Sequence, residues 1–405
     1  MKIITAKWIY DGEHLLADRA VAFEKRIEAV GPTKEITRLF PEANIVELPE
    51  NEVLLPGLIN PHLHLEFGAN TTHLRYGDFM GWLNSVISKR DELIEACKAG
   101  CFKRQIEFML ESGITSFGAV SSYGRDLKAC AAAPQRVVFF NEAIGSQPAA
   151  VDALYADFMQ RLEDSEKMAS ETFIPAIAIH SPYSVHPILI KKILSHADKR
   201  ALSAHFMESP AERDWLTKGE GDFRPFFENF LKQSSPLSFP EEFLQLLDGK
   251  KCMLTHAVWA DENLLEMIAK SGHSITHCPR SNRLLGCGRL KIERLEEYEI
   301  AWTLGTDGLS SNNSLSLWDE MRAALMMHSA YEPNTLAENL LKASTSRAAD
   351  ALFLPAGRIK KSNYADMITV PLAHKIEREE DFALQLIVHA KEARKVIIGG
   401  EEIRG

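Results

Sequence analysis

The sequence lacks any long uninterrupted hydrophobic run. No stretch approaches the roughly 18–20 apolar residues that a membrane-spanning helix needs. Residues 1–16, MKIITAKWIYDGEHLL, have no extended apolar centre and no cleavage site of small residues, so we expect no secretory signal peptide. Both absences favour a cytoplasmic protein without a membrane partner.

Cysteine is scarce and follows no pairing pattern. The six cysteines, at positions 97, 101, 130, 252, 278 and 287, include no C-x-x-C pair. Scattered cysteines are typical of free thiols in a reducing cytoplasm and not of a disulfide framework. We expect Cys97 and Cys101, four residues apart, to share one buried face of a helix.

The chain also lacks an excess of positive charge. It contains 46 Lys and Arg and 56 Asp and Glu, which gives a formal net charge of −10. Nucleic acid binding needs a basic surface, so nucleic acid is excluded as the main partner. The length of 405 residues suits either two domains or one large α/β barrel with additions.

What the sequence does contain is an alternation of strand-like and helical patterns between about residues 53 and 325. An example of the helical type is DENLLEMIAKSG, in which Leu264, Leu265 and Ile268 recur at helical spacing. The strand-like apolar runs cover 53–59, 113–120, 136–145, 175–184, 201–209, 251–258, 273–279 and 300–307. Eight such units predict a (β/α)8 TIM barrel.

The two ends of the chain differ from this centre, because both contain short strand-like pieces separated by turn signals. We expect residues 1–52 and 353–405 to form a composite β-sandwich beside a barrel of residues 53–352. An insertion near 210–247 includes WLTKGEGDFRPFFENFLKQSSPLSF, at 215–239. Its Phe226 and Phe227 either line a pocket as part of a lid or belong to the core.

The stretch INPHLHLEF places His62 and His64 one residue apart at the end of the first barrel strand. Side chains at i and i+2 of a strand point to the same side, and imidazole is the commonest nitrogen ligand for metals. The carboxyl ends of barrel strands face the active site. Further side chains of this kind follow the fourth, fifth, sixth and eighth strands: His180, His205, His256 and Asp307. We therefore predict a metal site on this rim.

The donor types limit which metal binds and how many ions there are. Three imidazoles and one carboxylate favour Zn²⁺, with Fe²⁺ or Mn²⁺ as alternatives. A second metal would need a bridging anion, and the fourth strand end, AIAIHSPYS, has no lysine that could be carbamylated. We expect one divalent metal.

Five segments carry a resemblance to a known family: PGLINPHLH, HFMES, LTHAV, HCPRSNRLLG and GTDGLSSNNSLSLWDEMR. Together they resemble the amidohydrolase superfamily, and within it the mononuclear deaminase branch with adenosylhomocysteine deaminases, guanine deaminases and triazine chlorohydrolases. The resemblance covers essentially the whole chain. It implies that the metal ligands are His62, His64, His205 and Asp307.

The resemblance also implies catalytic roles for Glu208, His256 and Asp307. Glu208 occupies the last position of an H-x-x-E pattern in HFMES; taken alone it would read as a surface carboxylate. Asp307 would accept a proton from water, His256 would polarise the hydroxide, and Glu208 would protonate a substrate ring nitrogen. The implied reaction is the hydrolytic deamination of an aromatic ring.

Finer motifs, among them HLEF, YGDFMGWL, HSPYSV and DGLSSNNSLSL, resemble aminofutalosine deaminases. The resemblance implies conversion of the purine nucleoside 6-amino-6-deoxyfutalosine to futalosine and ammonia in menaquinone biosynthesis. A deaminase of S-adenosylhomocysteine or 5′-methylthioadenosine is the alternative, and a non-catalytic scaffold with an amidohydrolase fold is a remote one. Family members often form homodimers, so a homodimer is an open expectation.

Several side chains are expected to contact this substrate. His180 and Trp82 are interpreted as base and ribose partners, although Trp82 suits core packing equally. Arg283 either clamps a carboxylate or lies solvated on its loop. Glu66 has no assigned role, and a structural salt bridge is its default reading. The full set of expected substrate contacts is His180, Trp82, Asp91, Glu66, Ser281, Asn282 and Arg283.

Overall fold

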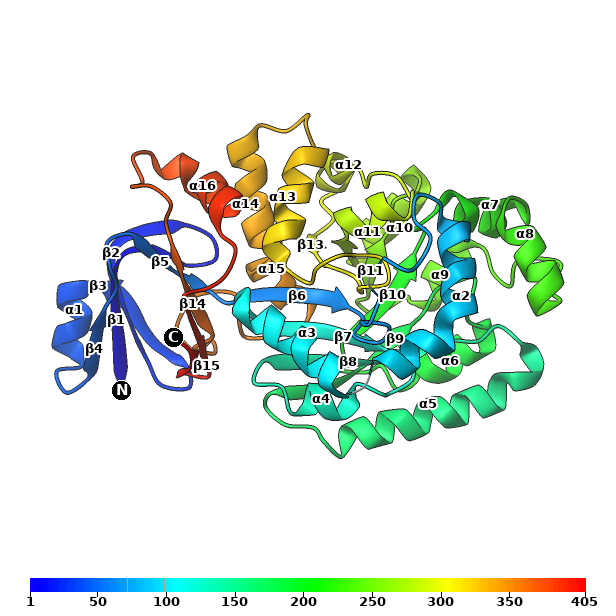
Figure 1. Cartoon of the computed structure of the whole chain (residues 1–405), viewed down its shortest axis with the longest axis horizontal. Helices are drawn as coiled ribbons and strands as arrows, with labels where there is room; N and C mark the ends of the chain where they lie inside the picture. Colours follow the sequence, from blue (N-terminus) through cyan, green and yellow to red (C-terminus); the bar gives the residue numbers. More distant parts are fainter. Residues whose placement is uncertain (71, 98) are drawn as a thin grey trace.

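The computed structural model describes residues 1–70, 72–97 and 99–405. Two sheets of eight strands organise this part of the chain. Figure 1 shows a barrel surrounded by helices and, to its left, a sheet built from both ends of the chain. The predicted combination of a (β/α)8 barrel with a composite β-rich unit is confirmed.

The barrel strands follow one another in sequence order, each parallel to the next. They are β6 (Leu58–Leu63), β7 (Ile114–Ser121), β8 (Arg136–Ala143), β9 (Phe173–Ile179), β10 (Leu202–Phe206), β11 (Met253–His256), β12 (Ser274–His277) and β13 (Trp302–Leu304). Every residue of β7 and β8 is buried, because helices cover the outside of a parallel barrel. All eight predicted runs overlap a barrel strand, although the run 53–59 includes only the first two residues of β6.

Helices connect these strands and cover the barrel. Several begin at side-chain caps, since Asp78, Ser209 and Asp261 accept backbone N–H groups from Gly81, Glu212 and Leu264. Among the described residues, no helix has both the length and the apolar character to cross a membrane. The helices are α2 (Phe79–Ala96), α3 (Ala99–Glu111), α4 (Leu127–Ala131), α5 (Val151–Glu166), α6 (Pro187–Leu194), α7 (Pro210–Lys218), α8 (Phe223–Phe226), η2 (Phe227–Leu231), α9 (Pro240–Leu246), α10 (Glu262–Ser271), α11 (Pro279–Leu284), α12 (Ile292–Glu297), α13 (Leu317–Met327), α14 (Pro333–Ala343) and α15 (Ser346–Ala351).

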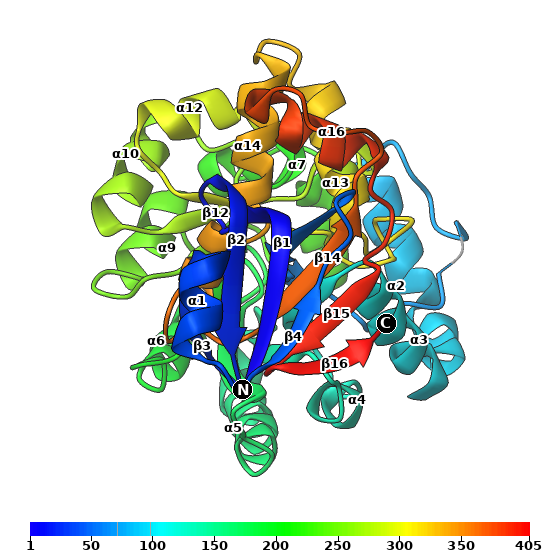
Figure 2. The same ribbon diagram turned by 90° about the vertical axis from the view of Figure 1, so that its left-hand side faces the viewer.

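The second sheet is mixed and has the order β16-β15-β14-β5-β1-β2-β3, with β4 also paired to β1. Figure 2 views this terminal sheet face on, with α1 (Thr33–Leu39) beside β2 and β3. Its strands are β1 (Lys2–Tyr10), β2 (Leu15–Phe23), β3 (Ile27–Pro32), β4 (Asn44–Glu47), β5 (Glu52–Pro56), β14 (Met367–Pro371), β15 (Lys395–Ile398) and β16 (Glu401–Arg404). Helix α16 (Phe382–His389) lies between β14 and β15 in the chain.

The apolar run at 53–59 is divided between the two sheets. Strand β5 pairs with β1 and β14, whereas β6 pairs with β7, so the first barrel strand begins at Leu58. Gly57 makes the crossing possible, because a Cβ there would lie 2.0 Å from the Thr115 hydroxyl oxygen. The divisions at 52/53 and 352/353 stay predictions.

The expectation of free thiols is wrong for Cys97 and Cys101, which form a disulfide. Cys97 caps the end of α2 and Cys101 lies in α3, so the pair joins two helices and does not share the face of one. The other cysteines, at 130, 252, 278 and 287, are buried and free. The cytoplasmic location stays a prediction, and only these four free thiols still support it.

Candidate metal centre and active site

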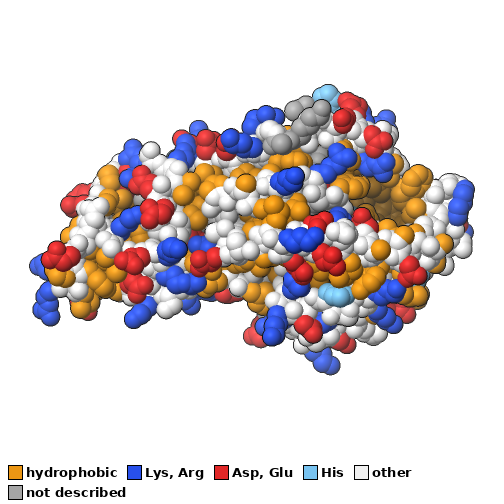
Figure 3. Space-filling view, turned by 90° about the horizontal axis from the view of Figure 1, so that it is seen from below, with side chains coloured by type: hydrophobic (Ala, Val, Ile, Leu, Met, Phe, Trp, Pro, Cys, Tyr) orange, Lys and Arg blue, Asp and Glu red, His pale blue; other side chains and the backbone are white. Residues whose placement is uncertain are grey.

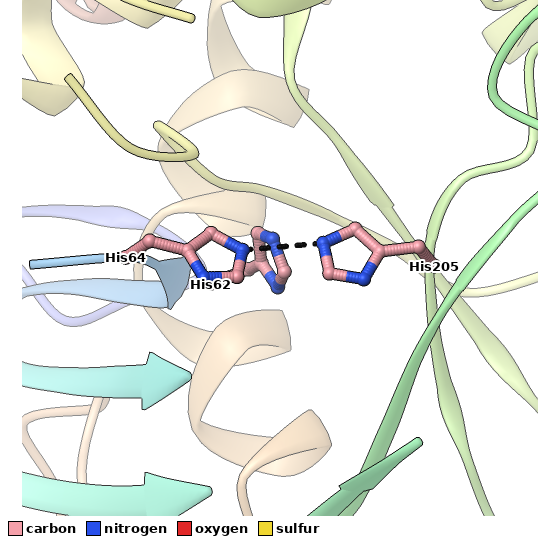
Figure 4. Close-up of side chains that lie close together, drawn as sticks. All are labelled: His62, His64 and His205. Carbon is pink, nitrogen blue, oxygen red and sulfur yellow. Dashed lines mark hydrogen bonds between the residues drawn. The ribbon is translucent and has the colours of Figure 1, made fainter. Parts of the chain in front are cut away.

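The predicted metal ligands come together at the carboxyl ends of the barrel strands. Figure 4 shows the rings of His62, His64 and His205 turned toward one another, with 3.2 Å between the Nε2 atoms of His64 and His205. Oδ1 of Asp307 lies 3.9 Å from Nε2 of His62 and 3.7 Å from Nε2 of His64. Residues from three distant parts of the chain thus converge, as predicted.

The donor atoms of this cluster fit a cation. Nε2 of His62 is buried and has no hydrogen-bond partner among the described residues, which is costly unless something binds it. Nδ1 of His205 donates to the carbonyl oxygen of His180 at 2.9 Å, which leaves its Nε2 lone pair facing the cluster. Burial, followed by the neighbouring imidazoles, lowers the pKa of His205 to about 3. Burial also lowers the pKa of His62, so the His62 and His205 rings are neutral, the form that binds metals.

Asp307 is held in place as an ionised carboxylate. Its Oδ2 accepts hydrogen bonds from the hydroxyls of Ser281 and Ser311, both at 2.7 Å, and its Oδ1 accepts the N–H of Gly308 at 2.8 Å. Burial alone would raise the pKa of Asp307, but the surrounding imidazoles, His64 foremost, bring it below its ordinary value. The backbone of Asp307 has a φ of 57°, a left-handed conformation that aims the side chain at the cluster.

Glu208 and His256 lie beside Asp307 as an acid and a neutral imidazole. Nδ1 of His256 donates to Oδ1 of Asn282 at 2.8 Å, and its Nε2 lies 3.5 Å from Oε1 of Glu208. Burial, together with the charges of Asp307 and Glu212, raises the pKa of Glu208 well above its ordinary 4.5. The site thus holds a carboxyl group whose pKa is raised next to a carboxylate whose pKa is lowered.

Glu212 fixes the turn that carries Glu208, and the sequence analysis missed it. Its carboxylate accepts the N–H groups of Met207 at 3.0 Å and Glu208 at 2.7 Å, while its own N–H is bound by Ser209. Burial raises the pKa of Glu212 to about 7, although these backbone N–H groups lower it. Ser209 and Glu212 form the S-x-x-E pattern of a helix start, the signal that could have found this residue.

A cavity of about 490 Å³ opens beside this cluster. His64, His205, Glu208, His256 and Asp307 are among the residues that line it, so three of the predicted ligands and the proton-transfer groups face the same space. Figure 3 shows a hollow with hydrophobic walls toward the end of the molecule that is remote from the terminal sheet. A cluster of imidazoles, a carboxyl group of raised pKa and an apolar chamber together suit hydrolysis of a largely apolar ring compound.

The amidohydrolase family model matches residues 53–403, which span the whole barrel and most of the C-terminal segment. The chain belongs to the amidohydrolase family.

Three relatives place this amidohydrolase more closely. The aminodeoxyfutalosine deaminase of Nitratiruptor sp. is 44% identical over 404 residues, 99% of each chain. A 5-methylthioadenosine/S-adenosylhomocysteine deaminase of Archaeoglobus fulgidus is 26% identical over 99% of this chain and 91% of its own. The crystal structure of Helicobacter pylori aminofutalosine deaminase in complex with methylthio-coformycin matches with a TM-score of 0.94 and 31% identity, covering 100% of both chains.

Of the expected substrate contacts in this amidohydrolase, His180 and Trp82 line the cavity. Nδ1 of His180 lies 2.7 Å from the Ser184 hydroxyl, and burial, then His64, lowers the pKa of His180 to about 3. Nε1–H of Trp82 donates to the carbonyl oxygen of Ser310 at 2.9 Å, so the half-buried indole is both anchored and in reach of a ligand.

The other expected contacts lie outside the cavity wall. Ser281 and Asn282 are buried behind it, where they bind Asp307 and His256. Arg283 and Asp91 are exposed. Glu66 forms no salt bridge in the described chain; its buried carboxylate accepts the N–H groups that follow β7, at residues 122, 123 and 125. The expectation of a salt bridge at Glu66 is therefore wrong, because backbone N–H groups and not a cationic side chain bind its carboxylate.

The insertion at 215–239 contributes to both the core and the cavity. Phe227 is buried and its ring stacks on Trp215, with 4.6 Å between centroids. Phe226 is half-buried, and both phenyl rings line the cavity. The segment therefore belongs to the core and also lines the cavity, and its role as a lid stays a prediction. Helix α2 adds Arg90 to the cavity wall, which the sequence analysis missed because nothing in helical spacing marks which polar residue faces a ligand.

Proposed function

We propose that this amidohydrolase is a metal-dependent deaminase that converts 6-amino-6-deoxyfutalosine to futalosine and ammonia in menaquinone biosynthesis. The observation that carries the proposal is the cluster of His62, His64, His205 and Asp307, with Glu208, a carboxyl group of raised pKa, at its side. The full-length similarity to the Nitratiruptor aminodeoxyfutalosine deaminase, at 44% identity, supports the choice of substrate.

We propose that one divalent metal, preferably Zn²⁺, is held by His62, His64, His205 and Asp307. Nitrogen and oxygen donors of this kind suit Zn²⁺, and Fe²⁺ or Mn²⁺ would accept the same set. When bound, such a cation supplies hydroxide from water near neutral pH. The unpartnered Nε2 of His62 and the lowered pKa values of His62 and His205 support this assignment.

The residues of the chain would move the protons of the reaction. Asp307 accepts the proton that water loses, and Nε2 of His256 orients the attacking oxygen toward the amine-bearing carbon. The Glu208 carboxyl donates its proton to the adjacent ring nitrogen, which removes the negative charge that would otherwise develop there. A proton returned through the same side chains then allows the amine to leave as ammonia.

His180 and Trp82 would bind the nucleoside, because both line the cavity next to the cluster. A neutral His180 leaves Nε2 available for a hydrogen bond to base or ribose. Ser281 and Asn282 would act through Asp307 and His256. Asp91 and Arg283 have no part in this proposal, since neither side chain lines the cavity.

The same cluster would serve a deaminase of 5′-methylthioadenosine or S-adenosylhomocysteine. The relative of that name reaches 26% identity, against 44% for the aminodeoxyfutalosine deaminase, so the proposal favours the latter. A non-catalytic scaffold is disfavoured, because every proposed ligand and proton-transfer residue is present and all but the half-buried His64 are buried. A homodimer stays a prediction.

Steady-state kinetics of the zinc-reconstituted protein would test the proposal. Aminodeoxyfutalosine, 5′-methylthioadenosine, S-adenosylhomocysteine and adenosine would be compared by ammonia release. We expect the highest kcat/KM for aminodeoxyfutalosine, and loss of nearly all activity after chelation or in Asp307→Asn. Failure to turn over aminodeoxyfutalosine while another of these nucleosides reacts rapidly would overturn it.

A further inference from the structure

The wall of the cavity changes character away from the metal cluster. The cluster comes from strand ends, whereas Leu83, Val86 and Ile87 come from α2 and Phe226 and Leu231 come from the 215–239 insertion. Nothing in this apolar part is needed to bind an adenine ring or to move a proton. It offers room for a hydrophobic group attached to the nucleoside.

Arg90 stands on the same face of α2 as these apolar residues. Positions 83, 86, 87 and 90 follow the helical repeat, so their side chains point to one side of α2, the side toward the cavity. Arg90 is the one lysine or arginine among the described residues that line the cavity. The carboxyl groups in the lining, from Glu142, Glu208 and Asp307, would repel an anion.

Arg90 has two side-chain partners, Asp91 and Tyr123, and its contact with Asp91 is one that a ligand can replace. Its Nε lies 3.0 Å from Oδ1 of Asp91, and the two side chains are 51% and 87% exposed. An ion pair this exposed is weak, because water screens it. A planar guanidinium matches a carboxylate with two parallel hydrogen bonds, and apolar walls around such a pair strengthen it.

We propose that Arg90 determines specificity by binding an anionic group at the end of the substrate's 5′-substituent. The substituent is an aromatic acid whose ring lies against Leu83, Val86 and Phe226 and whose carboxylate meets the guanidinium. Asp91 releases Arg90 as the ligand enters. The inference rests on the proposed function for the nucleoside half of the ligand and adds the residue that recognises the other half.

Two matched nucleosides separate the acid from the ring: 5′-deoxy-5′-(3-carboxyphenylthio)adenosine and 5′-deoxy-5′-(phenylthio)adenosine. Dissociation constants for both would be measured by calorimetry on zinc-reconstituted protein in a Glu208→Gln background, which slows deamination during the titration; below, wild type means this background with Arg90 intact. We expect Arg90→Gln to weaken binding of the carboxylated compound at least tenfold and to leave the phenyl compound within twofold. Arg90→Lys should recover part of the loss, because an ammonium keeps the charge but not the fork.

Lys103→Gln provides the matched control for loss of one positive charge. Lys103 lies on the neighbouring helix α3, is 75% exposed and does not line the cavity, so both dissociation constants should stay unchanged. Asp91→Asn should have the opposite effect to Arg90→Gln on binding of the carboxylated compound. Removing the competing carboxylate should tighten binding of the carboxylated compound about twofold, whereas an Asp91 that bound ribose would weaken binding of both compounds.

Equal effects of Arg90→Gln on both compounds, or no effect on the carboxylated one, would overturn the inference. The same holds if wild-type protein binds the two compounds equally. Because binding is the readout, this test is separate from the test of catalysis. A protein that fails to deaminate aminodeoxyfutalosine yet loses its preference for the carboxylated compound in Arg90→Gln would contradict the proposed reaction and uphold the role of Arg90.

Discussion

Glu208 carries the acid function of the site through its surroundings. The side chain is 7% exposed as a residue and has a raised pKa, first because of burial and then because of Asp307 and Glu212. Glu208→Gln keeps the size of the side chain but has no proton to give. We expect kcat for aminodeoxyfutalosine to fall by about 10²–10⁴-fold, the usual range for loss of a general acid.

Measuring the zinc content of Glu208→Gln shows whether the lost activity comes from proton transfer or from a lost metal. Glu208 is not among the proposed ligands, so zinc per chain, measured by elemental analysis after reconstitution, should equal that of wild type. A variant that keeps wild-type kcat would show that another group protonates the ring. A variant that loses its zinc would move Glu208 from proton transfer to metal binding.

Asp126 supports a prediction about stability and pH. It is fully buried, its Oδ1 accepts a hydrogen bond from the Ser121 hydroxyl at 2.5 Å, and Oδ2 has no partner in the described chain. Burial, followed by the charge of Glu66, raises the pKa of Asp126 from 3.8 to about 8. Between these values the folded chain holds a proton that the unfolded chain has lost, so its stability falls as pH rises.

Asp126→Asn removes this titration. The free energy of unfolding of wild type, relative to the variant, should therefore decline from pH 5 to pH 8, by at most about 1.4 kcal/mol per pH unit. Urea unfolding at several pH values would measure it. Asp222→Asn, at an exposed position, is the control and should leave the pH profile unchanged. A difference between Asp126→Asn and wild type that does not vary with pH would refute the raised pKa.

For single residues, the sequence predicts where a side chain lies when its position along a strand decides the direction in which it points. His62, His64, His205, His256 and Asp307 are of this kind, since the ends of parallel strands meet on one rim. Other side chains depend on contacts that spacing does not specify: those of Glu66, Glu142, Glu212 and Arg90. Each meets its partner across a loop or from a neighbouring element, so only the folded chain shows what it does.

The 215–239 insertion joins core packing and cavity lining in one element. Phe227 is 1% exposed and stacks on Trp215, whereas Phe226 is half-buried. We expect Phe227→Ala to lower the free energy of unfolding by about 3–5 kcal/mol, as for large-to-small changes in a core. Phe226→Ala should cost less than half of that and should raise KM for aminodeoxyfutalosine, because it removes cavity wall.

Denaturant unfolding and steady-state kinetics on the two variants would separate these effects. The adjacent phenylalanines serve as controls for each other, since they differ in burial and not in chemistry. Equal losses of stability would show that the insertion packs both rings alike. An unchanged KM in Phe226→Ala would remove this ring from the substrate chamber.

Elements whose residues share one environment are predictable from sequence, and those that cross a boundary are not. The barrel strands from β7 to β13 are predictable because nearly all of their residues are buried. The run at 53–59 reads as one strand but serves two sheets, because hydrophobic residues suit either one. Cys97 and Cys101 fit one helical face by spacing, yet the break between α2 and α3 brings them together as a disulfide.

At the scale of the whole molecule, a buried ion pair joins the two sheets. Arg136 begins barrel strand β8, and its guanidinium binds Asp366, directly before β14 of the terminal sheet, with Nε 2.6 Å from Oδ2. The two side chains are 3% and 1% exposed. The guanidinium also lies over the Tyr364 ring, and Gly399 donates its N–H to Asp366. The composite architecture is predictable from the pattern of the chain ends, but this contact depends on three-dimensional closeness alone.

Removing one partner of this pair should destabilise the junction strongly, because the other charge stays buried without compensation. We expect Arg136→Ala to lower the free energy of unfolding by about 3–5 kcal/mol, and Asp366→Ala to have a comparable effect. The double variant Arg136→Met, Asp366→Leu should lose much less, since apolar side chains leave no unpaired charge at the junction. A double-mutant cycle in urea measures this coupling. Single losses that simply add in the double variant would mean that the two sheets are held together by their apolar surfaces, with the ion pair as a bystander.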